Sequence, residues 1–129
     1  MTNEDLTTPR IQVLTNAYAF FNQRDIESVL AVIHPSVRWA NGWESGYLMG
    51  REEVSAYWTR QWQEVDPVVE PLQFDVLPGN SIRATVHQRV HNKNGELITD
   101  GIVYHTYTFA EDLIAEMSIS HPAPTAVTY

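Results

Sequence analysis

The fold is decided by an alternating stretch in the second half of the chain, Ile82-Arg83-Ala84-Thr85-Val86-His87-Gln88-Arg89-Val90-His91. The period of two is typical of a half-buried β-strand with one polar face. Asn94-Gly95 follows it and is a strong signal for a hairpin turn. A longer strand is expected over residues 98–109, where β-branched and aromatic side chains dominate. This half of the chain therefore predicts an antiparallel sheet.

Two further strands are expected on either side of this hairpin. Residues 72–77 form the first, which ends at Pro78-Gly79-Asn80. Residues 113–119 form the other, after a turn at residues 110–112. The tail His121 to Tyr129, which contains two prolines, is expected either to lie on the surface or to cap another part of the fold.

The first half of the chain has helical spacing instead. Thr8 is a suitable N-cap with Pro9 at the first helical position, and the apolar stripe that follows runs to Phe21. A second helix is expected from Asp25 as its cap to Ile33, ended by His34-Pro35. A short strand over residues 37–40 and a glycine-rich loop precede a third helix at 51–65, which Asp66-Pro67 stops.

Three helices followed by an antiparallel meander predict the α+β class, with helices packed on one face of a curved sheet. A length of 129 residues suits one domain over residues 1–129, with a core from about residue 9 to 121 and a tail at 122–129.

Composition excludes several classes of function. The net charge of −8 is unfavourable for binding nucleic acid or anionic lipid. The absence of cysteine excludes disulfides, thiolate nucleophiles and cysteine zinc sites. The polar N-terminus predicts no signal peptide, and no apolar run is long enough to span a bilayer. We therefore expect a cytoplasmic protein without membrane contact, metal site, phosphate loop or other cofactor.

Several local strings, in the order in which they occur, resemble one family. They are Phe20-Phe21-Asn22-Gln23-Arg24-Asp25, Ile33-His34-Pro35, Val37-Arg38-Trp39-Ala40-Asn41-Gly42 and, most characteristic, Gly50-Arg51-Glu52-Glu53-Val54-Ser55-Ala56-Tyr57-Trp58. Over about residues 10–120 the chain resembles the NTF2-like superfamily, in its SnoaL-like and ketosteroid-isomerase-like branch. The resemblance implies a cone-shaped, strongly curved antiparallel sheet, a cystatin-like roll, wrapped around three N-terminal helices. It also implies an apolar pocket and a homodimer formed through the sheet.

The resemblance does not extend to the catalytic groups of ketosteroid isomerase, an Asp base and a Tyr–Asp oxyanion hole. A gapless count places Asn41 at the base position, and an amide has no useful proton affinity. The same count places Ala17 at the tyrosine position, His105 at the sheet aspartate and Trp58 at a pocket tyrosine. That mechanism is therefore not expected here.

His105 is the first candidate for chemistry, because imidazole moves protons near neutral pH and the resemblance directs it to the cavity. The alternative is a buried histidine that is hydrogen-bonded to a neighbour and has no further role. His87 joins it only if the strand register turns both rings inward; otherwise His87 lies on the outer or dimer surface. Asn41 either polarises a substrate oxygen or forms a turn before Gly42.

The remaining candidates would bind a ligand. All four tryptophans lie between residues 39 and 62, a concentration that suits a pocket for a flat apolar molecule as well as a core. The ligand-binding set is Tyr18, Trp39, Trp58, Val103, Tyr107 and His121, of which Tyr18 could also be core and His121 an inert tail residue. Trp62 is expected in the core, and Trp43 is either a lid or a packing residue.

The sequence thus predicts a protein that binds a small, mostly apolar and cyclic organic ligand. Its activity would be that of a cofactor-free isomerase, cyclase or dehydratase, with His105 as acid and base and Asn41, His87 or Tyr18 polarising oxygen. The alternative is a ligand-binding or dimerisation module without turnover.

Overall fold

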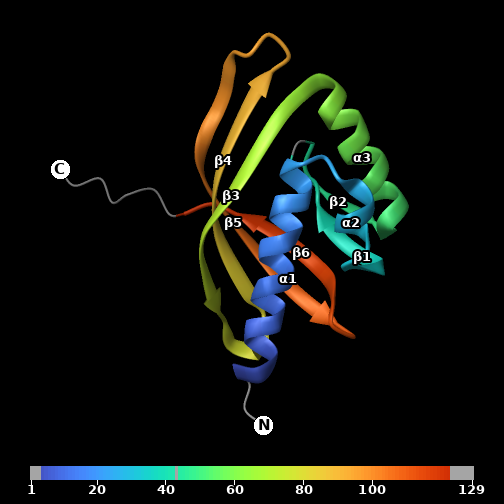
Figure 1. The fold of residues 1–129 in the computed structure, drawn as a ribbon, viewed down its shortest axis with the longest axis vertical. Coiled ribbons are helices and arrows are strands. Elements are labelled where there is room, and N and C mark those ends of the chain that lie inside the picture. The colour runs from blue at the N-terminus through green and yellow to red at the C-terminus, as the bar shows by residue number, and fades with distance from the viewer. Residues whose placement is uncertain (1–3, 43, 123–129) are drawn as a thin grey trace, which may run out of the picture.

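The structure is a computed structural model that describes residues 4–42 and 44–122 (Figure 1). Three helices lie in the first half of the chain, α1 Glu4–Asn22, α2 Ile26–Leu30 and α3 Gly50–Glu64. The strands are β1 Ile33–Ala40, β2 Tyr47–Met49, β3 Val65–Val76, β4 Ile82–Asn92, β5 Leu97–Ala110 and β6 Leu113–Ser120, with a 3-10 turn at Pro78–Asn80. The α+β class with N-terminal helices is thereby confirmed.

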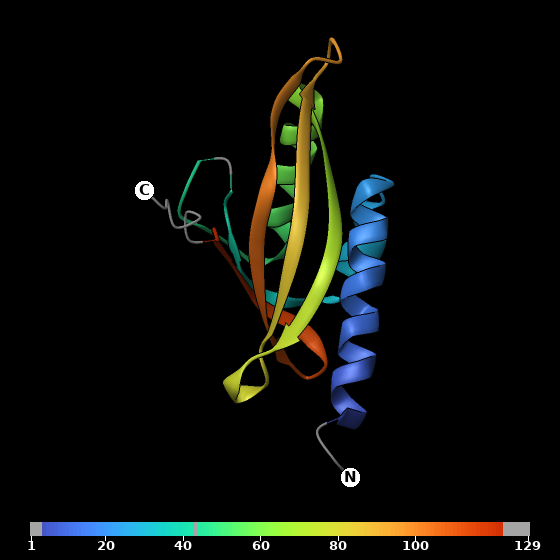
Figure 2. The ribbon, with the colours of Figure 1, turned by 90° about the vertical axis from the view of Figure 1, so that its left-hand side faces the viewer.

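One six-stranded sheet joins all the described strands, in the order β2-β1-β6-β5-β4-β3. Every neighbouring pair is antiparallel except β1 and β6, which are parallel. The sheet is not strongly curled, unlike the expected cone. Since β6 ends opposite Tyr104, only β3, β4 and β5 continue beyond it, and these form a twisted ribbon (Figure 2).

The first helix begins earlier than predicted, at Glu4, and contains Pro9. A proline so near the N-terminus removes a single intrahelical hydrogen bond, so the helix tolerates it. The apolar stripe predicted for this helix is confirmed at Leu14 and Tyr18, which are buried. At the end of α1, Asn22 fixes the helix to β3: its Nδ2 donates to Val69 O at 2.7 Å and its Oδ1 accepts from Val69 N at 2.9 Å.

Two of the predicted helix ends differ from the structure, because their residues belong to strands. The predicted second helix stops at Leu30, and His34 and Pro35 belong to β1. Asp66-Pro67 does end α3, but β3 starts at once and includes Pro67 and Pro71. Since β3 is an edge strand, its prolines do not interrupt pairing on both sides.

The β4–β5 hairpin and β6 follow the prediction closely, whereas the first strand of the meander, predicted at residues 72–77, begins at Val65. Asn94-Gly95 forms the β4–β5 turn, where Gly95 has a φ of 85° and donates to Asn92 O. Residues 111 and 112, both with positive φ, turn β5 into β6. The short strand β2 was not predicted, because it lies in the glycine-rich segment.

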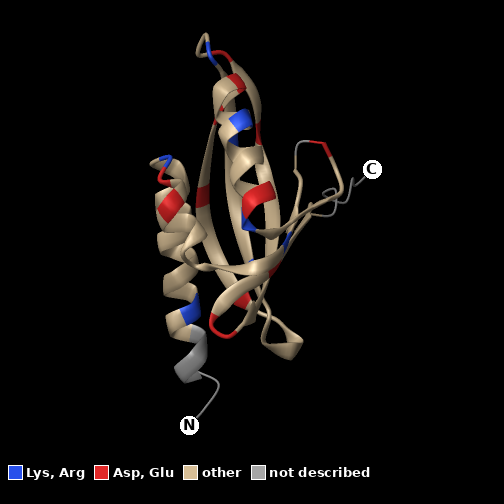
Figure 3. Cartoon of the chain, turned by 90° about the vertical axis from the view of Figure 1, so that its right-hand side faces the viewer, with Lys and Arg blue, Asp and Glu red and all other residues tan. Residues whose placement is uncertain are grey.

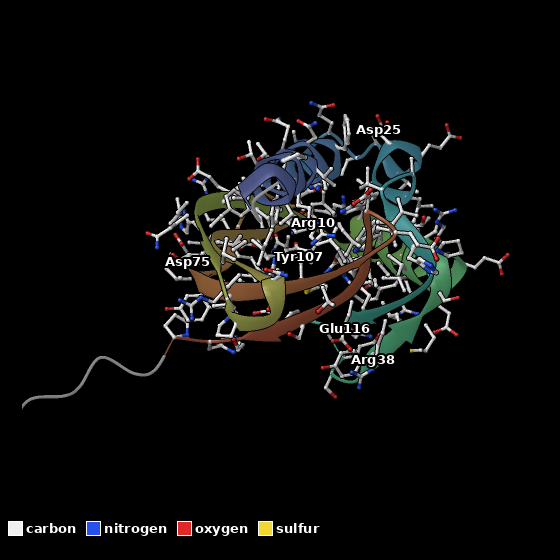
Figure 4. The ribbon with its side chains drawn as sticks, turned by 90° about the horizontal axis from the view of Figure 1, so that it is seen from below. Arg10, Asp25, Arg38, Asp75, Tyr107 and Glu116 are labelled. Carbon is white, nitrogen blue, oxygen red and sulfur yellow. The ribbon has the colours of Figure 1, made fainter. Side chains whose placement is uncertain are left out.

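The register places His105 opposite Ala84 on one side and Ile119 on the other. Ala84 is fully buried, so this face of the sheet points toward the helices. Tyr107, opposite Ile82 and Met117, shares the face (Figure 4).

Charged side chains lie around this core. In the view of Figure 3 the acidic residues outnumber the basic ones and the two are scattered over helices, strand ends and loops. Arg38 and Glu116, which form an ion pair at 2.9 Å, lie at the periphery in Figure 4. Within the described ranges, no helix combines the length and apolar character that crossing a membrane requires.

Candidate functional site

A cavity of about 930 Å³ lies between the inner face of the sheet and the helices α1 and α3. Its Phe, Trp and Tyr lining comes from elements far apart in the sequence: Tyr18, Phe21, Trp39, Tyr47, Tyr57, Trp58 and Tyr107. Such a volume and lining are typical of small-molecule sites. The cavity thus brings together residues from both halves of the chain.

Three polar side chains form a continuous hydrogen-bonded chain within this lining. Tyr107 donates its hydroxyl hydrogen to the hydroxyl oxygen of Tyr18 at 2.7 Å. The Tyr18 oxygen lies 2.8 Å from Nδ1 of His105. Tyr107 donates to the Tyr18 oxygen, so within these contacts Nδ1 is the acceptor that remains for the Tyr18 hydrogen. We call this chain of Tyr107, Tyr18 and His105 the relay.

The relay sets the tautomer of His105. A neutral imidazole whose Nδ1 accepts a hydrogen bond carries its hydrogen on Nε2. Burial lowers the pKa of His105 to about 4, since desolvation disfavours the imidazolium. At neutral pH the ring is therefore uncharged and presents an N–H donor. No described residue hydrogen-bonds to Nε2, and His105 lines the cavity.

The two tyrosines of the relay are uncharged as well. Burial raises the pKa of Tyr18 well above its ordinary value, and the neighbouring Tyr107 raises it further. Burial also raises the pKa of Tyr107, although its hydrogen bond to Tyr18 acts in the opposite direction. At the relay, the cavity wall therefore contains dipoles and hydrogen-bond donors but no formal charge.

The aromatic wall is held by edge-to-face contacts. Trp39 and Trp58 meet with ring centroids 5.4 Å apart at 87°, and Phe21 meets Trp58 at the same distance. Trp39 also meets Tyr107, at 6.2 Å, which joins this wall to the relay. Trp62, expected in the core, is half-buried and stacks on Trp58 outside the cavity lining. Trp43 lies outside the described residues.

Asn41 lines the cavity and forms the turn of the adjoining loop. Its Oδ1 accepts from the backbone N–H of Glu44 at 2.9 Å, and its Nδ2 donates to Glu44 Oε1 at 3.4 Å. Glu44 in turn pairs with Arg60 of α3. The turn predicted at Asn41 is therefore present, and the residue also lines the cavity, while its role toward a substrate oxygen stays a prediction.

His87 does not join His105. Side chains alternate along a strand, and His87 stands three residues from Ala84, the partner of His105, so it projects from the opposite face. There its Nε2 hydrogen-bonds with Asp100 of β5. The other candidates, Val103 and His121 among them, do line the cavity.

Sequence reasoning missed Gln88, Tyr57 and Glu44, which also line the cavity. The signal for Gln88 was present in the alternation: it occupies the buried phase of β4 between Val86 and Val90. Within the described part of the chain, no three His, Asp or Glu side chains gather as metal ligands.

Comparison with known proteins agrees with this architecture. The family model of the SnoaL-like domain matches residues 14–117. Among curated proteins, no sequence match is significant.

Solved structures share the fold over most of the chain. An NTF2-like protein of unknown function from Burkholderia pseudomallei is 22% identical, with a TM-score of 0.77 over 88% of this chain and 91% of its own. TerC, co-crystallized with polyporic acid, is 20% identical, with a TM-score of 0.77 over 88% and 92%. RV0760c from Mycobacterium tuberculosis, in complex with estradiol-17beta-hemisuccinate, is 16% identical, with a TM-score of 0.73 over 84% and 90%. Identities this low establish the shared fold alone.

Proposed function

The chain belongs to the SnoaL-like domain family of the NTF2-like superfamily, and on that premise we propose that its cavity binds a mostly apolar, cyclic organic molecule. The observation that carries the proposal is the relay in an otherwise aromatic cavity of about 930 Å³. Aromatic walls bind flat rings, and one N–H donor fixes their orientation.

The apolar contribution to binding is substantial. A flat ligand that loses roughly 200 Å² of apolar surface to Trp39, Trp58 and Phe21 gains about 5 kcal/mol at about 25 cal/mol per Å². Taken alone, this gain corresponds to a dissociation constant of about 0.2 mM, and the costs of association offset part of it. Polyporic acid and the steroid ester, the molecules held by TerC and RV0760c, are cyclic and of suitable size, which supports the proposal.

A second candidate is cofactor-free proton transfer, as in an isomerase, cyclase or dehydratase step. It is supported by the neutral imidazole of His105 on the cavity wall, with Asn41 as a further polar group. Nε2 can accept a proton from a substrate only in the other tautomer of His105, in which the ring hydrogen lies on Nδ1. Nδ1 then donates to the Tyr18 oxygen, so the direction of that hydrogen bond is reversed. The resting arrangement supports polarisation of a substrate oxygen by Nε2–H instead. A dimer formed through the outer face of the sheet stays a prediction, and so does a location in the cytoplasm.

Binding is tested by quenching of tryptophan fluorescence with biphenyl as the probe. Val103→Phe fills the cavity, whereas Thr106→Phe adds the same ring to the outer face of the same strand as a control. We expect quenching that saturates in the wild type and in Thr106→Phe and is weakened in Val103→Phe. Equal quenching in all three proteins would place the probe elsewhere and contradict the proposal.

Turnover is tested with a cyclic β,γ-unsaturated ketone, whose conversion to the conjugated isomer is followed by ultraviolet absorbance. Native mass spectrometry distinguishes a retained ligand from a released product. Conversion that is lost in His105→Gln supports the enzyme, whereas binding of the unchanged ketone supports a carrier.

A further inference from the structure

We propose that the ligand of this cavity is elongated and carries an oxygen acceptor near each end, one bound by His105 and the other by Gln88. The inference rests on the proposed function, which it deepens by naming the class of ligand. It starts from the position of two polar groups on one wall of the cavity.

The first group is the Nε2–H of His105. The relay occupies Nδ1, so the imidazole has one remaining hydrogen-bonding atom, and it is a donor. A ketone, quinone or ether oxygen is a suitable partner, whereas an ammonium group or another group that can only donate is not. Leaving this N–H without a partner in the presence of a purely apolar ligand costs free energy.

The second group is the side-chain amide of Gln88. Gln88 lies on the inward-facing side of β4, together with the buried residues Ile82, Ala84, Val86 and Val90. Gln88 is half-buried and lines the cavity, with no side-chain hydrogen bond to another described residue. Its amide can therefore donate to a ligand oxygen in the cavity.

The register gives the separation of the two groups. His105 lies opposite Ala84, and Gln88 lies opposite Gly101, four residues further along β4. At a rise of roughly 3.3 Å per residue, this corresponds to roughly 13 Å. Between the two levels lies the pair Val86 and Val103, of which Val103 lines the cavity. Along the strands, the cavity wall is therefore polar at His105, apolar at Val103 and polar again at Gln88.

The ligand class follows from this pattern. Side chains lean along the strand as well as out of it, and each hydrogen bond spans about 2.9 Å, so two oxygen atoms at opposite ends of a rigid system of two to four rings can reach both groups. A hydrocarbon leaves both groups without a partner.

The test compares biphenyl with 4,4′-diacetylbiphenyl, whose two carbonyl oxygens are acceptors at opposite ends. Dissociation constants are measured by tryptophan fluorescence for the wild type, His105→Phe and Gln88→Leu. Gln73→Leu is the matched control, because Gln73 is an exposed glutamine of β3 that bonds Asp75 outside the cavity. The ratio of the two constants within each protein removes the general effect of each substitution on the cavity.

A hydrogen bond of ordinary net strength changes affinity about fivefold. We expect the diketone to bind about 25-fold more tightly than biphenyl in the wild type and in Gln73→Leu. The ratio should fall to about fivefold in each of the other two variants. His105→Gln, whose amide can donate, should recover part of the loss.

Ratios that stay at the wild-type value in Gln88→Leu would overturn the proposal, even where His105→Phe fails to fold. A wild-type ratio near one would also overturn it while leaving apolar binding intact. Failure of biphenyl itself to bind would contradict the proposed function instead.

Discussion

Acidification should destabilise this protein through a single residue, His105. Burial lowers the pKa of its imidazole to about 4, whereas the unfolded chain has the ordinary value of about 6.5. Between these two values the unfolded state binds more protons, so the free energy of unfolding rises with pH in that window. The difference, at about 1.36 kcal/mol per pH unit, corresponds to about 3 kcal/mol that is present above pH 6.5 and lost as pH falls to about 4.

The assay is urea denaturation, followed by circular dichroism at several pH values from 4 to 8. His105→Asn is the informative variant, because its Oδ1 can accept from Tyr18 but does not titrate. His91→Gln removes a histidine from the outer face of the sheet as a control.

The stability gap between wild type and His105→Asn should shrink as pH falls through this window, and His91→Gln should follow the wild type. A gap that is constant with pH would refute the reasoning, since it would mean that His105 is not held neutral by burial.

Three further predictions concern hydrogen bonds elsewhere in and around the site. Tyr18→Phe removes the middle of the relay and leaves Tyr107 and His105, both buried, without their hydrogen-bond partner. Urea denaturation should show a decrease of about 2 kcal/mol in the free energy of unfolding. Side-chain NMR should show a mixture of His105 tautomers. Asn22→Ala should cost about 1–2 kcal/mol in the same assay, because both of its bonds to the Val69 backbone are lost, and an unchanged midpoint would contradict the role assigned to it. Glu44→Gln should change stability by less than about 0.5 kcal/mol, because its ion pair with α3 is exposed; a loss above about 1 kcal/mol would show that the loop contributes to the core.

The sheet could be predicted because its signals are local. The alternation around Val86, the Asn94-Gly95 turn and the β-branched run of β5 each act over a few residues. The errors fell where tertiary pairing competes with a local stop signal. The sequence predicts that His34-Pro35 and Asp66-Pro67 end helices, but strands include both. Pro67 lies on the edge strand β3, and Pro35 lies where the β1–β6 register shifts between Ile33 and Arg38.

The site was predicted in part. His105 was named from its strand face and the resemblance, and the cavity includes it. The bond from Tyr18 could not be read from the sequence, because it joins residues 87 positions apart. Whether His87 faces inward depended on a register that the turn alone did not fix. The sequence shows Gln88 as a polar residue on the apolar side of a strand, but its role as a cavity-lining residue follows only from the structure.

The most direct measurement of the central claim is a crystal structure of the protein with 4,4′-diacetylbiphenyl. The account predicts the biphenyl rings against Trp39 and Trp58, with one carbonyl oxygen within hydrogen-bond distance of His105 Nε2. A probe bound at the surface, or a closed interior with no space beside that imidazole, would contradict it.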